Sequence, residues 1–111
     1  MAWLLRDGEV LAALEVADSL GARSRGLLGR DGVDGALLIK PAMSVHTIGM
    51  RFPIDVAYCD RDMTVLCVVT MRRHRVGRLR LRSKCVVEAE AGAFERWGLR
   101  AGDRLEIKGE A

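Results

Sequence analysis

The residues best suited to chemistry lie in one stretch, residues 44–60, which reads SVHTIGMRFPIDVAYCD. It places His46, Thr47, Arg51 and Asp55 within ten positions, among apolar residues. Histidine exchanges a proton near neutral pH, and arginine binds a carboxylate or phosphate through two parallel hydrogen bonds. The stretch therefore predicts a polar site, although the residue types do not specify a reaction.

Several roles are open for the histidine of this stretch. His46 could be a hydrogen-bonded structural residue, could line a ligand pocket, or could act as a general base that Asp55 orients. No nucleophile-elbow motif or cysteine–histidine spacing marks Ser44, Thr47 or Cys59 as a nucleophile. We therefore assign no catalytic residue, and a small hydrolase-like enzyme with His46 as base is the less favoured interpretation.

The other charged residues have structural and functional interpretations as well. Arg51 and Asp55 flank Pro53 and could form an ion pair, or Arg51 could receive an anionic ligand. Glu88 follows an apolar residue and precedes another, and if it is buried it needs a partner such as Arg51 or Arg23. The histidine and the carboxylates are possible metal ligands, but no ligand spacing supports a metal site, and nothing indicates a cofactor.

A dense basic cluster occupies residues 72–84, which contain no acidic residue. The rest of the chain has eleven basic and fifteen acidic residues, so the positive charge is concentrated here. Such a cluster predicts either a solvated loop or a surface for nucleic acid or another polyanion. It has no aromatic residue for base stacking, so nucleic acid is not the favoured partner. The candidate contacts are Arg72, Arg73, Arg75, Arg78, Arg80, Arg82 and Lys84.

The length of 111 residues and an apolar content of 50% predict one folded domain over residues 1–111. Three cysteines without a CxxC spacing predict buried free thiols rather than disulfides or a zinc site. No stretch approaches the roughly 20 apolar residues of a membrane span, and the N-terminus lacks a signal-peptide pattern. We therefore expect a cytoplasmic protein with no membrane partner.

The pattern along the chain predicts strands joined by turns and one or two short helices. Asp7-Gly8 predicts a hairpin between strands over 2–6 and 9–17. A glycine-rich helix is expected over 20–29, with its backbone packed closely on a sheet. Further strands are expected over 36–40, 44–49, 54–60, 63–71, 83–91 and 104–108, with a helical turn over 92–97 that Gly98 ends. The stretch 44–60 would then supply the central pair of strands.

Four segments carry a recognisable pattern: RSRGLLGR, ALLIKP, SVHTIGMRFPIDVAYCD and VVEAEAGAFERWGLRAGDRLEI. Together they resemble the DUF192 family of small proteins of unknown function, and the match covers about residues 17–107. The resemblance implies an α+β, mainly antiparallel domain resembling a partly closed β-barrel, with one or two short helices. The family's recurring polar positions fall on Arg23, His46, Thr47, Arg51, Asp55, Glu88 and Asp103.

The chain departs from many members of that family in the segment around His46. Those members have a Trp/Met-Lys-Asn-Thr version, so the histidine is not obligatory, which argues against a catalytic base shared by the family. We predict a non-catalytic binding or accessory module for a small polar or anionic ligand or a protein partner. The candidate ligand-binding residues are His46, Thr47, Arg51, Asp55, Glu88 and Arg23.

Overall fold

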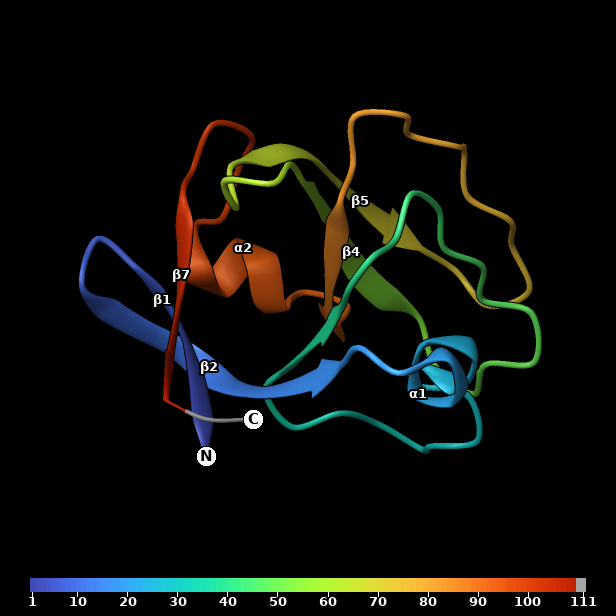
Figure 1. The fold of residues 1–111 in the computed structure, drawn as a ribbon. Helices are drawn as coiled ribbons and strands as arrows, with labels where there is room; N and C mark the ends of the chain where they lie inside the picture. Colours follow the sequence, from blue (N-terminus) through green and yellow to red (C-terminus); the bar gives the residue numbers. More distant parts are fainter. Residues whose placement is uncertain (110–111) are drawn as a thin grey trace.

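The computed structural model describes residues 1–109, which form an α+β fold with a mainly antiparallel sheet, as predicted (Figure 1). None of the helices in this part of the chain is long and apolar enough to cross a bilayer. The elements are β1 (Ala2–Arg6), β2 (Glu9–Ala17), α1 (Leu20–Arg25), β3 (Ala36–Ile39), β4 (Ile54–Cys59), β5 (Val65–Met71), β6 (Cys85–Glu90), α2 (Ala93–Trp97) and β7 (Leu105–Gly109).

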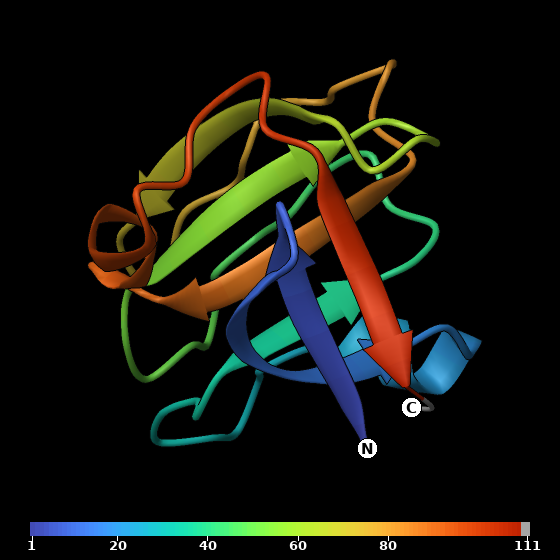
Figure 2. The same ribbon diagram turned by 90° about the vertical axis from the view of Figure 1, so that its left-hand side faces the viewer.

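The seven strands form one sheet in the order β5-β4-β6-β3-β2-β1-β7. Within residues 1–109, only β2 and β3 are parallel neighbours, and α1 lies in the crossover that a parallel pair requires. Figure 2 shows how strongly the sheet curls, with β1 and β7 running across β4 and β6. A single bridge between Thr64 and Arg104 joins the residues just before the two edge strands. The sheet is not closed along its length, so barrel-like describes its curvature only loosely.

The two faces of the sheet carry separate hydrophobic cores. The α2-side core includes Leu4, Leu38, Ala57, Val87 and Phe94. The α1-side core includes Leu27, Leu37, Val56, Tyr58 and Val86. Every residue of β4 is buried, because both of its faces are covered. Successive residues of a strand therefore belong to different cores, and this alternation decides where each polar side chain of β4 and β6 lies.

Two local predictions are confirmed in their backbone geometry. Asp7 and Gly8 connect β1 to β2 with φ values of 53° and 80°, the left-handed pair that an Asp-Gly hairpin turn requires. Gly98 ends α2 with a φ of 64°, and its N–H donates to Glu95 and Phe94 carbonyls. Both turns are determined by adjacent residues, which is why the sequence pattern identified them.

The helix predicted over 20–29 is shorter than expected. It begins after Ser19, whose hydroxyl accepts a hydrogen bond from the Ala22 N–H at 3.1 Å, and ends at Arg25. Gly26 has φ 50° and ψ −127°, which lies outside the helical region. The chain turns there and directs Leu27 into the α1-side core. Burial of Leu27 thus ends the helix four residues early.

The strand predicted over 44–49 is wrong. The side chains do alternate, with Val45 and Thr47 buried and His46 exposed, but only one β-bridge forms, between His46 and Val76. The backbone of Thr47 bonds instead to Arg75 and to the turn at His74. Because these bonds go to a turn, they cannot extend into the repeated hydrogen bonding of a sheet, and residues 44–50 form a loop. Of the two central strands expected in the stretch 44–60, only β4 forms.

Candidate functional site

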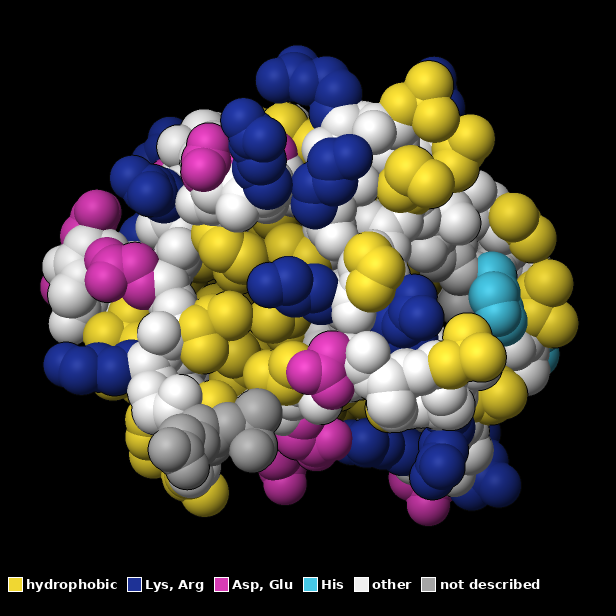
Figure 3. All heavy atoms as spheres, viewed as in Figure 1, with side chains coloured by type: hydrophobic (Ala, Val, Ile, Leu, Met, Phe, Trp, Pro, Cys, Tyr) yellow, Lys and Arg dark blue, Asp and Glu magenta, His cyan; other side chains and the backbone are white. Residues whose placement is uncertain are grey.

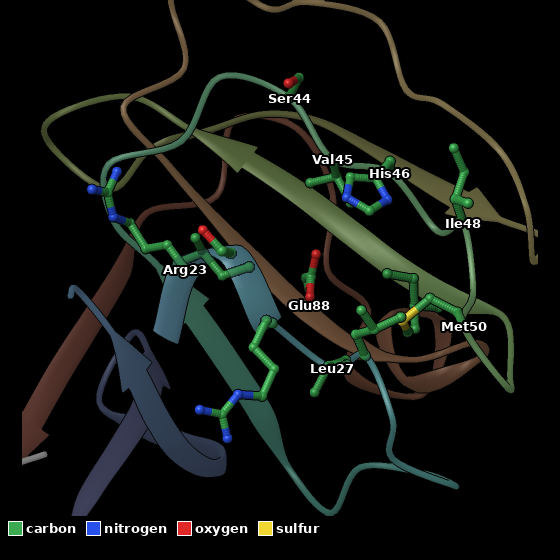
Figure 4. A pocket seen from close by; sticks show the side chains of 14 residues that line it. Arg23, Leu27, Ser44, Val45, His46, Ile48, Met50 and Glu88 are labelled. Atoms are coloured by element: carbon green, nitrogen blue, oxygen red, sulfur yellow. The ribbon is translucent and has the colours of Figure 1, made fainter. Parts of the chain in front are cut away.

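A recess opens on the α1 side of the sheet, between α1, the loop over 44–50 and β6 (Figure 4). Its volume is about 90 Å³. The walls are mostly aliphatic and are formed by Leu27, Ile39, Val45, Met50 and Ile54. The polar side chains at the recess include Arg23, Ser44, His46 and Glu88.

Glu88 lies at the base of the recess. It projects from the middle of β6, where it is paired with Leu37 of β3 and Val56 of β4, and it is 4% exposed. Within residues 1–109 its carboxyl group has no hydrogen-bond donor, and burial raises its pKa to about 7. Near neutral pH this buried carboxyl group therefore exists in both protonation states.

Arg23 and His46 flank Glu88 at the mouth of the recess. Figure 4 shows the Glu88 carboxyl group near the centre, with Arg23 from α1 on one side and His46 from the loop on the other. The Nη1 of Arg23 donates to the Pro41 carbonyl at 3.4 Å, while its buried Nε has no partner in the described chain. The mouth is therefore cationic, while the base carries a carboxyl group.

Gly26 keeps the space beside Glu88 open. A Cβ at this position would lie 3.6 Å from Ile39 Cδ1 and 3.9 Å from Glu88 Oε1. Its positive φ also favours glycine. The sequence-based expectation that a glycine brings this segment close to the sheet agrees with that contact.

Three of the predicted site residues do not line this recess: Arg51, Asp55 and Thr47. Arg51 is exposed and pairs with Asp31 at 2.8 Å, so the expected ion pair between Arg51 and Asp55 is wrong. Asp55 lies on the opposite face of the sheet from Glu88, because β4 pairs Val56 with Glu88 and Asp55 with Ala89. The idea that Asp55 orients His46 is therefore wrong as well.

Asp55 instead holds the start of α2. Its Oδ2 accepts hydrogen bonds from the N–H groups of Gly92 at 2.9 Å and Phe94 at 3.1 Å. Its Oδ1 accepts one from the Thr70 hydroxyl at 2.7 Å. α2 has no side-chain cap of its own at Gly92, so this buried carboxylate from β4 satisfies its first N–H groups.

Thr47 is completely buried and links two loops. Its N–H donates to the Arg75 carbonyl at 2.8 Å, and its carbonyl accepts from the His74 N–H at 2.8 Å. Its hydroxyl donates to the Arg72 carbonyl and accepts from the Arg75 N–H at 2.9 Å. These contacts hold the loop over 44–50 against the basic segment and thereby hold His46 at the mouth of the recess.

Comparison with known protein families gives a match over nearly the whole chain. The model of the DUF192 family, described as "Uncharacterized ACR", matches residues 2–107. The chain belongs to the DUF192 family. The match begins earlier than the resemblance over 17–107 indicated, since it includes the hairpin of β1 and β2.

Two solved structures share the fold of this DUF192 protein. A protein of unknown function from Novosphingobium aromaticivorans has a TM-score of 0.77 and 17% identity, covering 95% of this chain and 82% of that one. A protein from Sinorhizobium meliloti, described as a candidate transcription regulator, has a TM-score of 0.79 and 24% identity, covering 96% and 91%. The comparison with curated proteins found no match. At these identities the likeness establishes the fold alone.

The recess of this DUF192 protein includes residues that the sequence did not identify. Leu27, Val45 and Met50 form its walls, but their apolar character is equally typical of core residues. The sequence marks Gly26 only as one glycine of an expected helix that packs closely on a sheet. Two features of the sequence could have predicted the recess: the glycine that ends α1, and the single glutamate in the middle of the apolar strand β6.

The remaining candidate ligands and thiols do not form a cluster at the recess. No group of three or more His, Cys, Asp or Glu side chains within residues 1–109 is placed to hold a metal ion. Cys59 and Cys85 face each other across β4 and β6 as free, buried thiols in the α2-side core. The Cys85 thiol donates to the Met63 sulfur at 3.4 Å, and that of Cys59 donates to the Ala57 carbonyl at 3.9 Å. Their burial on the opposite face separates them from Glu88.

Proposed function

We propose that this DUF192 protein binds a small amine in the recess, with the ammonium group on Glu88. The observation that carries the proposal is the carboxyl group of Glu88, a residue that is 4% exposed: this group faces the recess, is largely desolvated, and has no donor within the described chain. Desolvation makes an ionised carboxylate unfavourable, and a ligand that donates hydrogen bonds to it offsets that cost.

The volume of the recess limits the size of the ligand. One water-sized group needs roughly 15 Å³ on the same measure, so the recess of about 90 Å³ accepts about six non-hydrogen atoms. Its aliphatic walls favour a short alkyl chain next to the ammonium group. A ligand this small binds in about the millimolar range.

The mouth of the recess favours an anionic group at the other end of the ligand. Arg23, Arg25 and His46 line the recess there, and guanidinium groups pair well with carboxylates. A short zwitterion of the amino-acid class combines both requirements. Binding is favoured over turnover, because Asp55, the residue that would have oriented His46, caps α2 on the other face of the sheet.

Isothermal titration with three matched compounds tests the proposal: β-alanine, n-propylamine and propionate. We expect β-alanine to bind more tightly than propylamine, and propionate to show no binding. The ammonium group requires the ionised carboxylate, so affinity should rise about tenfold from pH 6 to pH 8 around the Glu88 pKa of about 7.

Two variants distinguish the recess from the rest of the surface. Glu88→Gln should abolish binding of both amines, whereas Glu90→Gln, an exposed residue of the same strand, should leave it unchanged. Equal binding of propionate and propylamine, or amine binding by Glu88→Gln, would contradict the proposal.

We also propose a cytoplasmic location. The chain has three cysteines, an odd number without a CxxC spacing, which is typical of a reducing compartment. Thiol titration of freshly isolated protein in urea should detect all three cysteines, and a missing pair would argue for an oxidising compartment.

A further inference from the structure

A basic segment over 72–84 crosses the α1-side face beside the loop over 44–50, and we call it the basic strap. Its seven basic residues form none of the three ion pairs in the part of the chain that the structure describes. Those pairs involve Arg6, Arg30 and Arg51 instead. The strap therefore presents a concentrated positive charge that no acid of residues 1–109 neutralises.

Backbone contacts hold the strap in place. Besides the bonds to Thr47, the N–H of Gly77 donates to the Val45 carbonyl and that of Arg80 to the Met43 carbonyl, each at 2.8 Å. A Cβ on Gly77 would lie 2.7 Å from the Val45 carbonyl oxygen and 2.9 Å from the Tyr58 hydroxyl, so the strap packs tightly there. Its side chains are therefore presented by an ordered backbone.

The strap exposes large aliphatic side chains between its arginines. Val76 is 74% exposed, Leu79 63% and Leu81 72%. The guanidinium carbon of Arg80 lies 5.0 Å from the centre of the Tyr58 ring, so this arginine points inward while the two leucines beside it face solvent. Figure 3 shows hydrophobic side chains gathered along the upper right edge, where Figure 1 places the strap.

Beneath the strap lies an open hollow of about 480 Å³ against Tyr58 and β5. Four arginines line it, Arg72, Arg75, Arg78 and Arg80, and no acidic residue does. The buried Nε of Arg80 has no hydrogen-bond partner within the described residues. Guanidinium groups arranged in this way match a phosphate group.

We propose that the basic strap docks on the surface of an anionic phospholipid bilayer. The arginines contact lipid phosphates, and Leu79 and Leu81 enter the boundary between headgroups and acyl chains. Charge complementarity carries the proposal, together with the exposed aliphatic side chains. It is independent of the amine proposed for the recess.

The aliphatic side chains favour a bilayer over nucleic acid. Arginine contacts to phosphates would serve either partner, but a nucleic acid offers no apolar layer for leucine, and the strap has no aromatic residue to stack on a base. The sequence led us to expect no membrane partner because it contains no apolar span. Docking at the surface needs no span, and only the folded chain reveals that the strap leucines are exposed.

Vesicle co-sedimentation of the full chain tests the proposal, with phosphatidylcholine vesicles compared with vesicles containing phosphatidylglycerol. We expect binding to the anionic vesicles and none to the zwitterionic ones. Arg78→Gln with Arg82→Gln should weaken binding roughly fivefold per arginine. Leu79→Ser with Leu81→Ser should weaken it roughly tenfold or more, with the fold verified by circular dichroism.

Matched controls separate the strap from overall charge and hydrophobicity. Arg96→Gln with Arg100→Gln removes the same charge on the α2 side, and Leu20→Ser removes an exposed leucine of α1. Both variants should bind anionic vesicles like the unaltered protein. The proposal is overturned by equal binding to both vesicle types or by wild-type binding of the leucine double variant. It is also overturned if the protein does not bind vesicles but binds duplex DNA, and if the leucine double variant binds that DNA as tightly as the unaltered protein does.

Discussion

At the scale of single residues, Asp55 and Glu88 show how two buried carboxyl groups on neighbouring strands perform different tasks. Asp55 accepts three hydrogen bonds and stabilises the start of α2. Glu88 accepts none from the described residues and lies at the base of a recess. A satisfied buried carboxylate is typical of a structural role, whereas an unsatisfied one is a candidate for ligand binding.

Replacing Asp55 should strongly destabilise the protein. In Asp55→Ala the N–H groups of Gly92 and Phe94 lose a charged acceptor, and we expect the free energy of unfolding to fall by about 3 kcal/mol. Urea unfolding measures this loss. Thr70→Val removes only one of the three bonds, so it should cost about 1 kcal/mol. Equal losses in the two variants would contradict the capping role.

Glu88 should make the protein less stable as the pH rises. Below its unfolded pKa of 4.5 both states are protonated, and between 4.5 and about 7 only the folded state keeps the proton. Stability contributed by this group therefore falls as pH rises through that window, by up to about 3 kcal/mol.

Urea unfolding of Glu88→Gln at pH 5 and pH 8 isolates this contribution. Glutamine cannot ionise, so the variant should exceed the unaltered protein by about 1 kcal/mol at pH 5, where the loss has begun, and by about 3 kcal/mol at pH 8. Glu90→Gln is the control, because this exposed glutamate is not desolvated. If the difference in free energy of unfolding between the variant and the unaltered protein is the same at both pH values, the pKa of Glu88 is not raised by folding.

At the scale of elements, the recess and the basic strap share one support, the loop over 44–50. This loop is not part of the sheet, yet Thr47 fixes it to the strap through side-chain and backbone hydrogen bonds. The same connection holds His46 at the recess and orders the arginine-rich segment. The position of both candidate sites therefore depends on a buried residue that contacts neither ligand.

Thr47→Val should loosen the strap, because the change keeps the side-chain shape but removes the hydroxyl. The lost bonds to Arg72 and Arg75 cost about 1–3 kcal/mol locally, so the open form of the strap becomes roughly fivefold or more populated. Limited trypsin digestion should then cleave after the strap arginines correspondingly faster. Thr70→Val makes the same chemical change away from the loop, and faster strap cleavage in that variant would argue for general destabilisation instead.

At the scale of the whole molecule, one curved sheet separates two hydrophobic cores. Neighbouring residues of β3 serve different cores, since Leu37 belongs to the α1-side core and Leu38 to the α2-side core. β4 and β6 are buried on both faces and contribute to both. We infer that the two cores unfold together, because neither retains its sheet without the other.

Leu37→Ala and Leu38→Ala test this cooperativity from the two sides. Each variant leaves a cavity in a buried site and should lower the free energy of unfolding by about 2–5 kcal/mol. Unfolding followed by tryptophan fluorescence, which includes Trp97 of α2, should coincide with unfolding followed by far-UV circular dichroism. Two separate transitions in either variant would show that the cores are independent.

Elements with a local cause were predictable from the sequence. The hairpin at Asp7-Gly8, the end of α2 at Gly98 and the alternating strands β4 and β6 follow from backbone preferences and side-chain periodicity. These features involve residues close together in the chain, so a short window of sequence contains their physical cause. Of the candidate site, the polar residues Arg23, His46 and Glu88 were identified from their residue types and from the family resemblance.

Only the tertiary structure decided which of those residues meet. The alternation of side chains along one strand shows which of them share a face. The register between two strands decides which residues of the two lie side by side on the same face. The observed register pairs Val56 with Glu88, and a shift of one residue would have placed Asp55 beside Glu88 instead. The sequence alone determined a family, a fold class and a set of polar residues. The register of β4 on β6, together with the turn at Gly26, determined that Glu88, Arg23 and His46 are the three of the six candidate ligand-binding residues that line the recess.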